Sequence, residues 1–119
     1  MERDRRRFPR VSDKNMSLHL SSGDFDTTTQ TMNLSQSGVY CKIDKEIPLM
    51  SRVNLMLMLP DGHSERGKGV PVSGVIVRQH PVIIGGETKH YDVAIFFDDL
   101  DEKTRDIIKA YIDTRKSAA

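Results

Sequence analysis

Residues 70–97 read VPVSGVIVRQHPVIIGGETKHYDVAIFF, and this stretch decides the fold class. Two runs rich in valine, isoleucine and phenylalanine flank Gly85-Gly86, and a glycine pair between such runs is typical of a tight β-hairpin. Pro71 has no amide hydrogen, which favours a sheet edge or a bulge near the start of the first run. In the second run, alternate positions place four side chains on one face of a strand: Tyr91, Val93, Ile95 and Phe97. We predict strands over Val70–Gln79, Val82–Ile84 and Thr88–Phe97.

Upstream of this hairpin, four shorter runs also have the composition of strands. Threonine and the β-branched aliphatic residues favour strands, and the turn-forming residues 21–24 and 60–62 interrupt the series. Cys41 falls on the apolar side of the third run, where it is predicted to be a small core residue. The predicted strands are Met16–Leu20, Phe25–Met32, Val39–Ile43 and Val53–Leu59.

The last segment changes from the two-residue period of strands to the period of a helix. Residues that recur at intervals of three and four share one helix face: Leu100, Thr104, Ile107, Ile108, Tyr111 and Ile112. Asp99 followed by Glu102 resembles a capping box, and acidic residues suit the positive end of the helix dipole. We therefore predict a helix over residues 99–115, packed on a small antiparallel β-barrel over residues 16–98.

The composition is that of one soluble globular domain. The chain has 119 residues, of which 37% are hydrophobic and 29% are charged. It has no apolar stretch long enough to span a membrane and no secretory signal, and its single cysteine excludes an internal disulfide. We therefore expect a cytoplasmic protein. The net charge is only +1, although residues 1–10 carry five arginines against two acidic residues.

No pattern in the chain is typical of a catalytic, metal or cofactor site. The nucleophile elbow G-x-S-x-G, the P-loop and the dinucleotide motif G-x-G-x-x-G do not occur in the sequence. The histidines are scattered and have no partner at helical spacing: His19, His63, His80 and His90. We therefore expect a protein that is not an enzyme and that uses neither a metal nor a cofactor.

The first feature that points to a ligand lies near the N-terminus. Arg6 and Arg10 are four positions apart, and Pro9 pushes Phe8 towards extended geometry, so residues 1–15 are predicted to be a flexible basic arm. On an extended chain both arginine side chains lie on one side, roughly 13 Å apart. Guanidinium groups pair with phosphates and with the O6/N7 edge of guanine. Taken alone, an arginine run is more often a solvated basic tail.

The second feature is the hexapeptide Asn33-Leu34-Ser35-Gln36-Ser37-Gly38, which links two predicted strands. Asparagine, serine and glycine all favour turns, so a purely structural turn is one explanation of the hexapeptide. A binding role is the alternative. Asn33 and Ser35 alternate on one side, where both offer hydrogen bonds, and Gly38 permits close approach of a ligand to the backbone.

Together the two features resemble the hallmark of the PilZ family, R-x-x-x-R followed by [D/N]-x-S-x-x-G. The resemblance covers about residues 2–114. It implies a single, stand-alone PilZ domain with a six-stranded antiparallel β-barrel, a C-terminal helix and a flexible N-terminal arm. Ala94 departs from the pattern, since many relatives have glycine there, and the difference bears on packing.

The resemblance implies that the ligand is cyclic di-GMP, a bacterial second messenger. The implied ligand-binding residues are Arg6, Arg10, Asn33, Ser35 and Gly38. Arg5 and Arg78 are further candidate contacts, and Arg5 is the one expected to stack on a base.

A switch mechanism follows from this resemblance. Ligand binding is expected to order the N-terminal arm and to change the surface that an unidentified downstream protein reads. Two alternatives remain open: a PilZ-like adaptor that acts only through protein contacts, and a small nucleic-acid-binding barrel with a basic arm. The near-neutral charge and the few aromatic residues weigh against the second.

Overall fold

A computed structural model describes residues 16–23, 25–59 and 68–117, which form six strands and one helix. The predicted basic arm and the predicted turn at residues 60–62 lie outside the described residues. The elements in chain order are β1 (Ser17–Ser22), β2 (Phe25–Leu34), β3 (Gly38–Ile43), β4 (Arg52–Leu59), β5 (Lys68–Ile84), β6 (Glu87–Phe97) and α1 (Glu102–Ser117).

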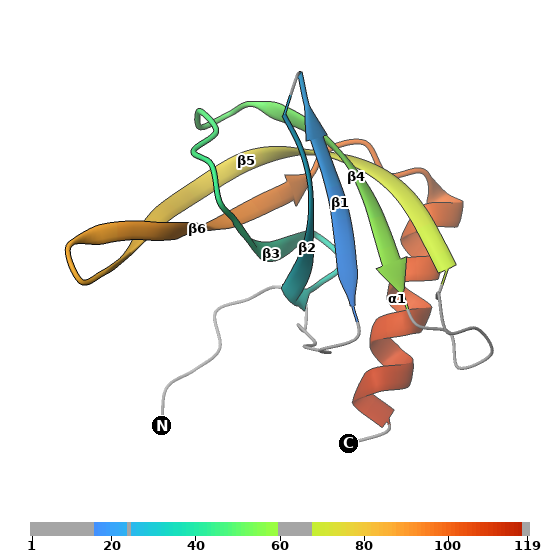
Figure 1. Cartoon of the computed structure of the whole chain (residues 1–119). Helices are drawn as coiled ribbons and strands as arrows, with labels where there is room; N and C mark the ends of the chain where they lie inside the picture. Colours follow the sequence, from blue (N-terminus) through green and yellow to red (C-terminus); the bar gives the residue numbers. More distant parts are fainter. Residues whose placement is uncertain (1–15, 24, 60–67, 118–119) are drawn as a thin grey trace.

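The strands form one antiparallel sheet that closes on itself (Figure 1). Neighbouring strands follow the order β1-β2-β3-β6-β5-β4, and β1 pairs with β4 as well as with β2. The helix α1 contacts β5 and lies beside the barrel (Figure 1). The predicted mainly β, antiparallel class with one C-terminal helix is confirmed.

The core fills the inside of the barrel because strand residues point inward and outward alternately. The run of residues in β4 is apolar almost throughout, yet it alternates in burial, and Met56 remains 38% exposed. The predicted inward face of β3 is buried, and so is most of the predicted face of β6. The buried hydrophobic residues of these two strands and of α1 are Val39, Cys41, Ile43, Val93, Ile95, Phe97, Ile108, Tyr111 and Ile112.

One long strand, β5, replaces the two strands predicted over Val70–Gln79 and Val82–Ile84. His80 and Pro81 continue the ladder by pairing with Asp92 and Tyr91 of β6, so the chain does not break between the two runs. The first half of β5 pairs with β4, and β6 becomes its partner only from Gly74 onward. Pro71 therefore lies where β5 has one partner strand, as the predicted edge position requires.

The tight turn between β5 and β6 forms as predicted. Gly85 and Gly86 have φ angles of 61° and 84°, which lie in the left-handed region that a two-residue hairpin turn requires. Ile84 and Glu87 pair directly across the turn. The last residue of β3, Ile43, pairs with Tyr91 of β6. The part of the β5–β6 hairpin that lies between Tyr91 and the turn projects from the barrel (Figure 1).

The helix begins at Glu102, so the start predicted at residue 99 was wrong. The Thr104 backbone N–H donates to Asp101 Oδ1 at 2.7 Å, which makes Asp101 the N-cap in place of Asp99. Asp98 is still tied to the sheet, because its Oδ1 accepts a hydrogen bond of 3.0 Å from the Ser73 hydroxyl. The helix therefore begins only after Asp98, beyond this contact with the sheet.

Candidate functional site

Four of the predicted ligand-binding residues lie in the described structure. Asn33 is near the end of β2, Ser35 is in the turn between β2 and β3, and Gly38 begins β3. Arg78 lies in β5. Arg5, Arg6 and Arg10 lie outside the described residues.

Ser35 holds the turn between β2 and β3 together. Its side chain is only 1% exposed. Its backbone N–H donates to the carbonyl oxygen of Gly38 at 2.9 Å, and its hydroxyl oxygen accepts a hydrogen bond of 3.2 Å from the N–H of Ser37. The structural explanation of the hexapeptide therefore applies to Ser35, whose hydroxyl group is occupied within the turn.

Gly38 lies where β3 and β6 approach each other very closely. It is buried and pairs with Phe96. A Cβ atom on Gly38 would lie 2.3 Å from the carbonyl oxygen of Ile95, a distance that no side chain tolerates. Strand packing is thus a sufficient reason for glycine at this position, and access for a ligand stays a prediction.

A row of four residues crosses the outside of the barrel and joins two of the predicted contacts. Asn33 pairs with Tyr40, Tyr40 with Ala94, and Ala94 with Arg78. None of the four is buried, whereas their neighbours Leu34, Val39 and Val93 are. Because adjacent strands lie about 4.8 Å apart, Asn33 and Arg78 are separated by about 14 Å across this outer-face row.

Two β-bulges lie at the two ends of the outer-face row. The register of β2 shifts between Thr31 and Asn33, and the register of β5 shifts between Ile76 and Arg78. A bulge inserts one extra residue and re-aims the next side chain, and bulges are common beside binding sites. The bulges place Asn33 and Arg78 in one row, a relation that residue spacing alone does not reveal.

The next row along the same strands carries charged and titratable groups. Lys42 of β3 pairs with Asp92 of β6, which pairs with His80 of β5. His90 Nε2 lies 3.3 Å from Asp92 Oδ1, and that oxygen accepts no hydrogen bond from the described part of the chain.

Burial, reinforced by the charge of Asp92, raises the pKa of Cys41 to about 12, so this cysteine is not a nucleophile.

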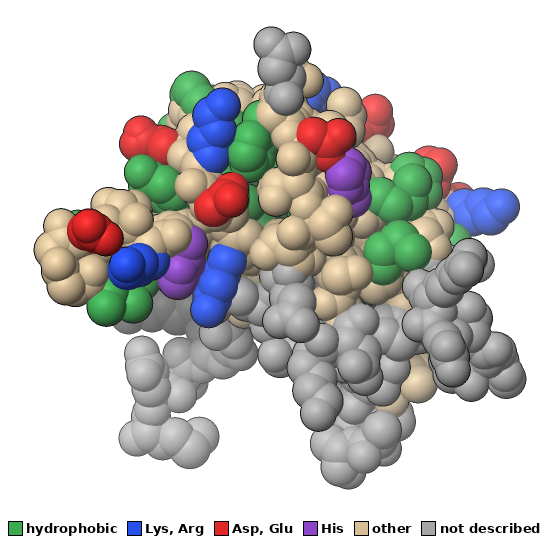
Figure 2. Space-filling model, viewed as in Figure 1, with side chains coloured by type: hydrophobic (Ala, Val, Ile, Leu, Met, Phe, Trp, Pro, Cys, Tyr) green, Lys and Arg blue, Asp and Glu red, His purple; other side chains and the backbone are tan. Residues whose placement is uncertain are grey.

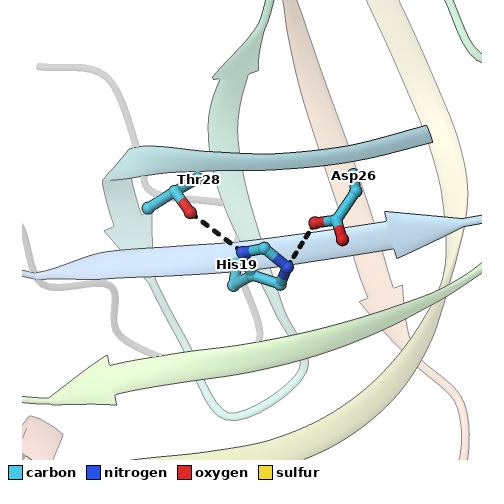
Figure 3. A network of polar contacts seen from close by, with 3 residues as sticks. All are labelled: His19, Asp26 and Thr28. Atoms are coloured by element: carbon cyan, nitrogen blue, oxygen red, sulfur yellow. Dashed lines mark hydrogen bonds and ion pairs between the residues drawn. The ribbon is translucent and has the colours of Figure 1, made fainter.

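Sequence reasoning missed a polar network on β1 and β2. His19 Nδ1 lies 2.9 Å from Thr28 Oγ1, and His19 Nε2 forms an ion pair with Asp26 (Figure 3). The signal was the turn at Gly23, because a hairpin centred there brings residue 19 opposite residue 28. The side chains of His19 and Asp26 are 45% and 60% exposed, and such an ion pair contributes at most about 1 kcal/mol. We therefore regard the network as surface pairing between two strands.

The surface chemistry of the described residues is mixed. Figure 2 shows acidic, basic and hydrophobic side chains interspersed over the viewed face. Within residues 16–23, 25–59 and 68–117, no three histidine, cysteine or acidic side chains gather as metal ligands would. In the same part of the chain, no helix has the length and apolarity needed to cross a membrane.

Comparison with known proteins gives a family and a fold. The family model described as "PilZ domain" matches residues 4–114. No curated protein matches the chain. Solved structures with a similar fold include the Bacillus subtilis inhibitor of motility MotI/DgrA, with a TM-score of 0.77 and 13% identity over 97% of this chain and 52% of that chain.

Two further structures of this fold were determined with c-di-GMP. The K. pneumonia MrkH complex has a TM-score of 0.68 and 14% identity over 92% of this chain and 51% of that chain. The PilZ domain of Escherichia coli YcgR has a TM-score of 0.68 and 14% identity over 97% of this chain and 94% of that chain. The chain thus spans about half the length of MotI/DgrA and MrkH, and it matches nearly the whole YcgR domain.

Proposed function

The chain belongs to the PilZ domain family, and from this premise we propose that it is a receptor for cyclic di-GMP. The observation that carries the proposal is the outer-face row, in which two bulges align Asn33 and Arg78, about 14 Å apart, on the outer face of the barrel. The YcgR domain and MrkH, which share the fold, were both solved with this ligand. The proposed activity is ligand binding, with no catalytic step, metal or cofactor.

In the proposed complex, arginines and the outer-face row hold the ligand between them. Arg6 and Arg10 pair with the phosphates and with guanine edges, because the guanidinium group is a planar donor fork. Asn33 hydrogen-bonds to one guanine, and Arg78 approaches the ligand from the other end of the row. Arg5 stacks on a base and favours a ligand dimer, which a stoichiometry unchanged in Arg5→Ala would argue against.

Ser35 and Gly38 act mainly through the turn that presents Asn33. The Ser35 hydroxyl is buried within that turn, so its hydrogen bond to a guanine requires a small opening of the turn. Gly38 lets β3 lie close against β6, and this packing holds Tyr40 and Ala94 of the outer-face row on adjacent strands beneath the ligand.

Binding is proposed to change what a partner protein meets at the surface. The ligand carries two negative charges, and residues 1–10 carry a surplus of positive charge. Ordering of this segment over the outer-face row would cover the row and create a new surface for an unidentified downstream protein. The exposed side chains of Ile83 and Ile84, at 61% and 58%, favour a role in protein contacts for the projecting hairpin.

Isothermal titration with cyclic di-GMP tests the proposal, with GTP and single-stranded DNA as control ligands. Arg6→Ala and Arg10→Ala are each expected to weaken binding about ten- to hundredfold, because each removes a charge-assisted contact. Lys109→Ala is the matched control, since it removes one exposed charge from α1 and is expected to bind normally.

Two other results would redirect the assignment. Absence of binding by a protein that is folded by circular dichroism would favour the ligand-independent adaptor, and partner capture would follow. Binding of single-stranded DNA with a steep salt dependence would favour the nucleic-acid-binding barrel.

A further inference from the structure

A cavity of about 680 Å³ lies beside the turn between β2 and β3, outside the outer-face row. Its walls come from three places: the turn, the end of β6, and the segment that leads into α1. The side chains that line it include Phe96, Asp99 and Arg105. Small-molecule sites commonly have volumes of about 300–1,000 Å³, so the space is sufficient for a nucleobase.

Phe96 provides an aromatic surface on one wall of the cavity. Its neighbours in β6, Ile95 and Phe97, point into the core, and the alternation of the strand leaves Phe96 outside with 51% of its surface exposed. Phe96 is two residues from Ala94, the centre of the outer-face row, which corresponds to about 7 Å along the strand. Exposed aromatic rings are stacking platforms for bases.

The cavity is also lined by an acidic and a basic side chain that have no side-chain partner among the described residues. Asp98, which also lines the cavity, already accepts a hydrogen bond from the Ser73 hydroxyl and forms an ion pair with Arg52, whose guanidinium lies 3.0 Å from its carboxylate. Asp99 and Arg105 are exposed, and neither side chain forms an ion pair or hydrogen bond with any residue of the described ranges. A carboxylate and a guanidinium in one cavity, not paired with each other, favour a ligand that presents both donors and acceptors.

Guanine has this combination of groups on adjacent edges. Its N1–H and N2–H donors match the two oxygens of a carboxylate, and its O6 and N7 acceptors match the fork of an arginine. We propose that this cavity takes one guanine of the bound ligand, with Phe96 against the ring, Asp99 at N1–H and N2–H, and Arg105 at O6 and N7. The inference rests on the proposed function, because it assigns a place to one base of cyclic di-GMP.

The proposal predicts that three variants bind cyclic di-GMP about ten- to hundredfold more weakly than the wild type: Phe96→Leu, Arg105→Ala and Asp99→Ala. Phe96→Leu keeps an apolar side chain but removes the ring face. Lys109→Ala, on the same helix as Arg105, is the control that is expected to bind normally. Thermal unfolding of each variant verifies that it is folded.

A ligand analogue identifies the contact of Asp99. Cyclic di-inosine monophosphate lacks the N2 amino group, so the wild type is expected to bind it about tenfold more weakly than cyclic di-GMP. Asp99→Ala is expected to bind the two ligands with similar affinity, because the carboxylate that reads N2 has been removed.

The outcomes separate this inference from the proposed function. If Arg6→Ala weakens binding but Phe96→Leu, Asp99→Ala and Arg105→Ala all bind like the wild type, the cavity is not a guanine site and the receptor function stands. If the wild type does not bind cyclic di-GMP, both proposals are wrong.

Discussion

Cys41 illustrates at the residue scale how burial decides chemistry. The thiol lies on the inner face of β3 with no exposed surface, and burial, followed by the charge of Asp92, raises its pKa to about 12. The reactive species is the thiolate, so we expect the native protein to leave Ellman's reagent unreacted at neutral pH and to react only when unfolded. Rapid labelling of the native protein would contradict this placement of Cys41.

The same pKa makes a stability prediction. The folded-state pKa of Cys41 is raised above its ordinary value of 9.0, so this stabilising contribution is complete below pH 9.0 and is lost as the pH rises towards 12. We expect the urea unfolding midpoint of the wild type to fall above about pH 9, and that of Cys41→Ala to fall less. Equal slopes for the two proteins would mean that other groups are responsible.

A substitution at Gly38 can affect both ligand binding and the stability of the fold, so the two effects are measured separately. A Cβ there would lie 2.3 Å from the Ile95 carbonyl oxygen, so Gly38→Ala must push β3 and β6 apart. We expect a loss of about 1–3 kcal/mol in the free energy of unfolding, measured without ligand by urea titration. Gly69→Ala is the control, because its Cβ would meet chiefly the flexible side chain of Met56. A Gly38→Ala protein as stable as the wild type would return Gly38 to a purely ligand-related role.

At the scale of the elements, α1 depends on its N-cap. The Thr104 backbone N–H donates to Asp101 Oδ1, and this bond, followed by the Thr104 side chain, lowers the pKa of Asp101. The stabilisation is therefore present above the ordinary pKa of 3.8 and is lost as the pH falls through the lowered value. We expect Asp101→Ala to lower the unfolding midpoint more than Asp101→Asn, which keeps an acceptor oxygen. Circular dichroism during urea unfolding measures both, and Asp99→Ala should have no such effect.

The hydrophobic periodicity of the sequence predicted most strands and the helix. The bounds that it did not predict depend on contacts between elements. The two-residue alternation identified the inner faces of β3 and β6, and Gly85-Gly86 identified the hairpin, because both depend on local geometry. The continuation of β5 through Pro81 depends on its partner β6, which lies far along the chain. The start of α1 depends likewise on the tie between Asp98 and Ser73.

The site was predicted less completely than the fold, for a related reason. The motif named Asn33, and Arg78 was a further candidate contact, but the two bulges that place them in one row follow from strand register. Ser35 was taken as a ligand contact, and the structure shows a hydroxyl that is engaged within its own turn. Phe96 and Arg105 belong to no motif, and it is the folded structure that places them in the lining of one cavity.

At the scale of the whole molecule, closure of the barrel gives the first described strand a partner on each side. β1 lies between β2 and β4 and supplies Leu18 and Leu20, both fully buried, to the core. Deletion of residues 1–22 would expose the edges of β2 and β4 and empty this part of the core. We expect the truncated chain to lose its cooperative unfolding transition altogether. A truncated protein that still unfolds cooperatively in urea would show that β1 is dispensable.

The hairpin formed by β5 and β6 makes the molecule suitable as a component for sensor engineering. Between Tyr91 and the turn, its two strands pair with no other strand of the described residues, and Gly85-Gly86 lies at the far end, away from the barrel core. A fluorescent protein inserted at that glycine pair would interrupt none of the pairings that close the barrel. The tip would then serve as a fixed attachment point, against which a second fluorophore at the N-terminus reports the distance between arm and hairpin inside a living cell.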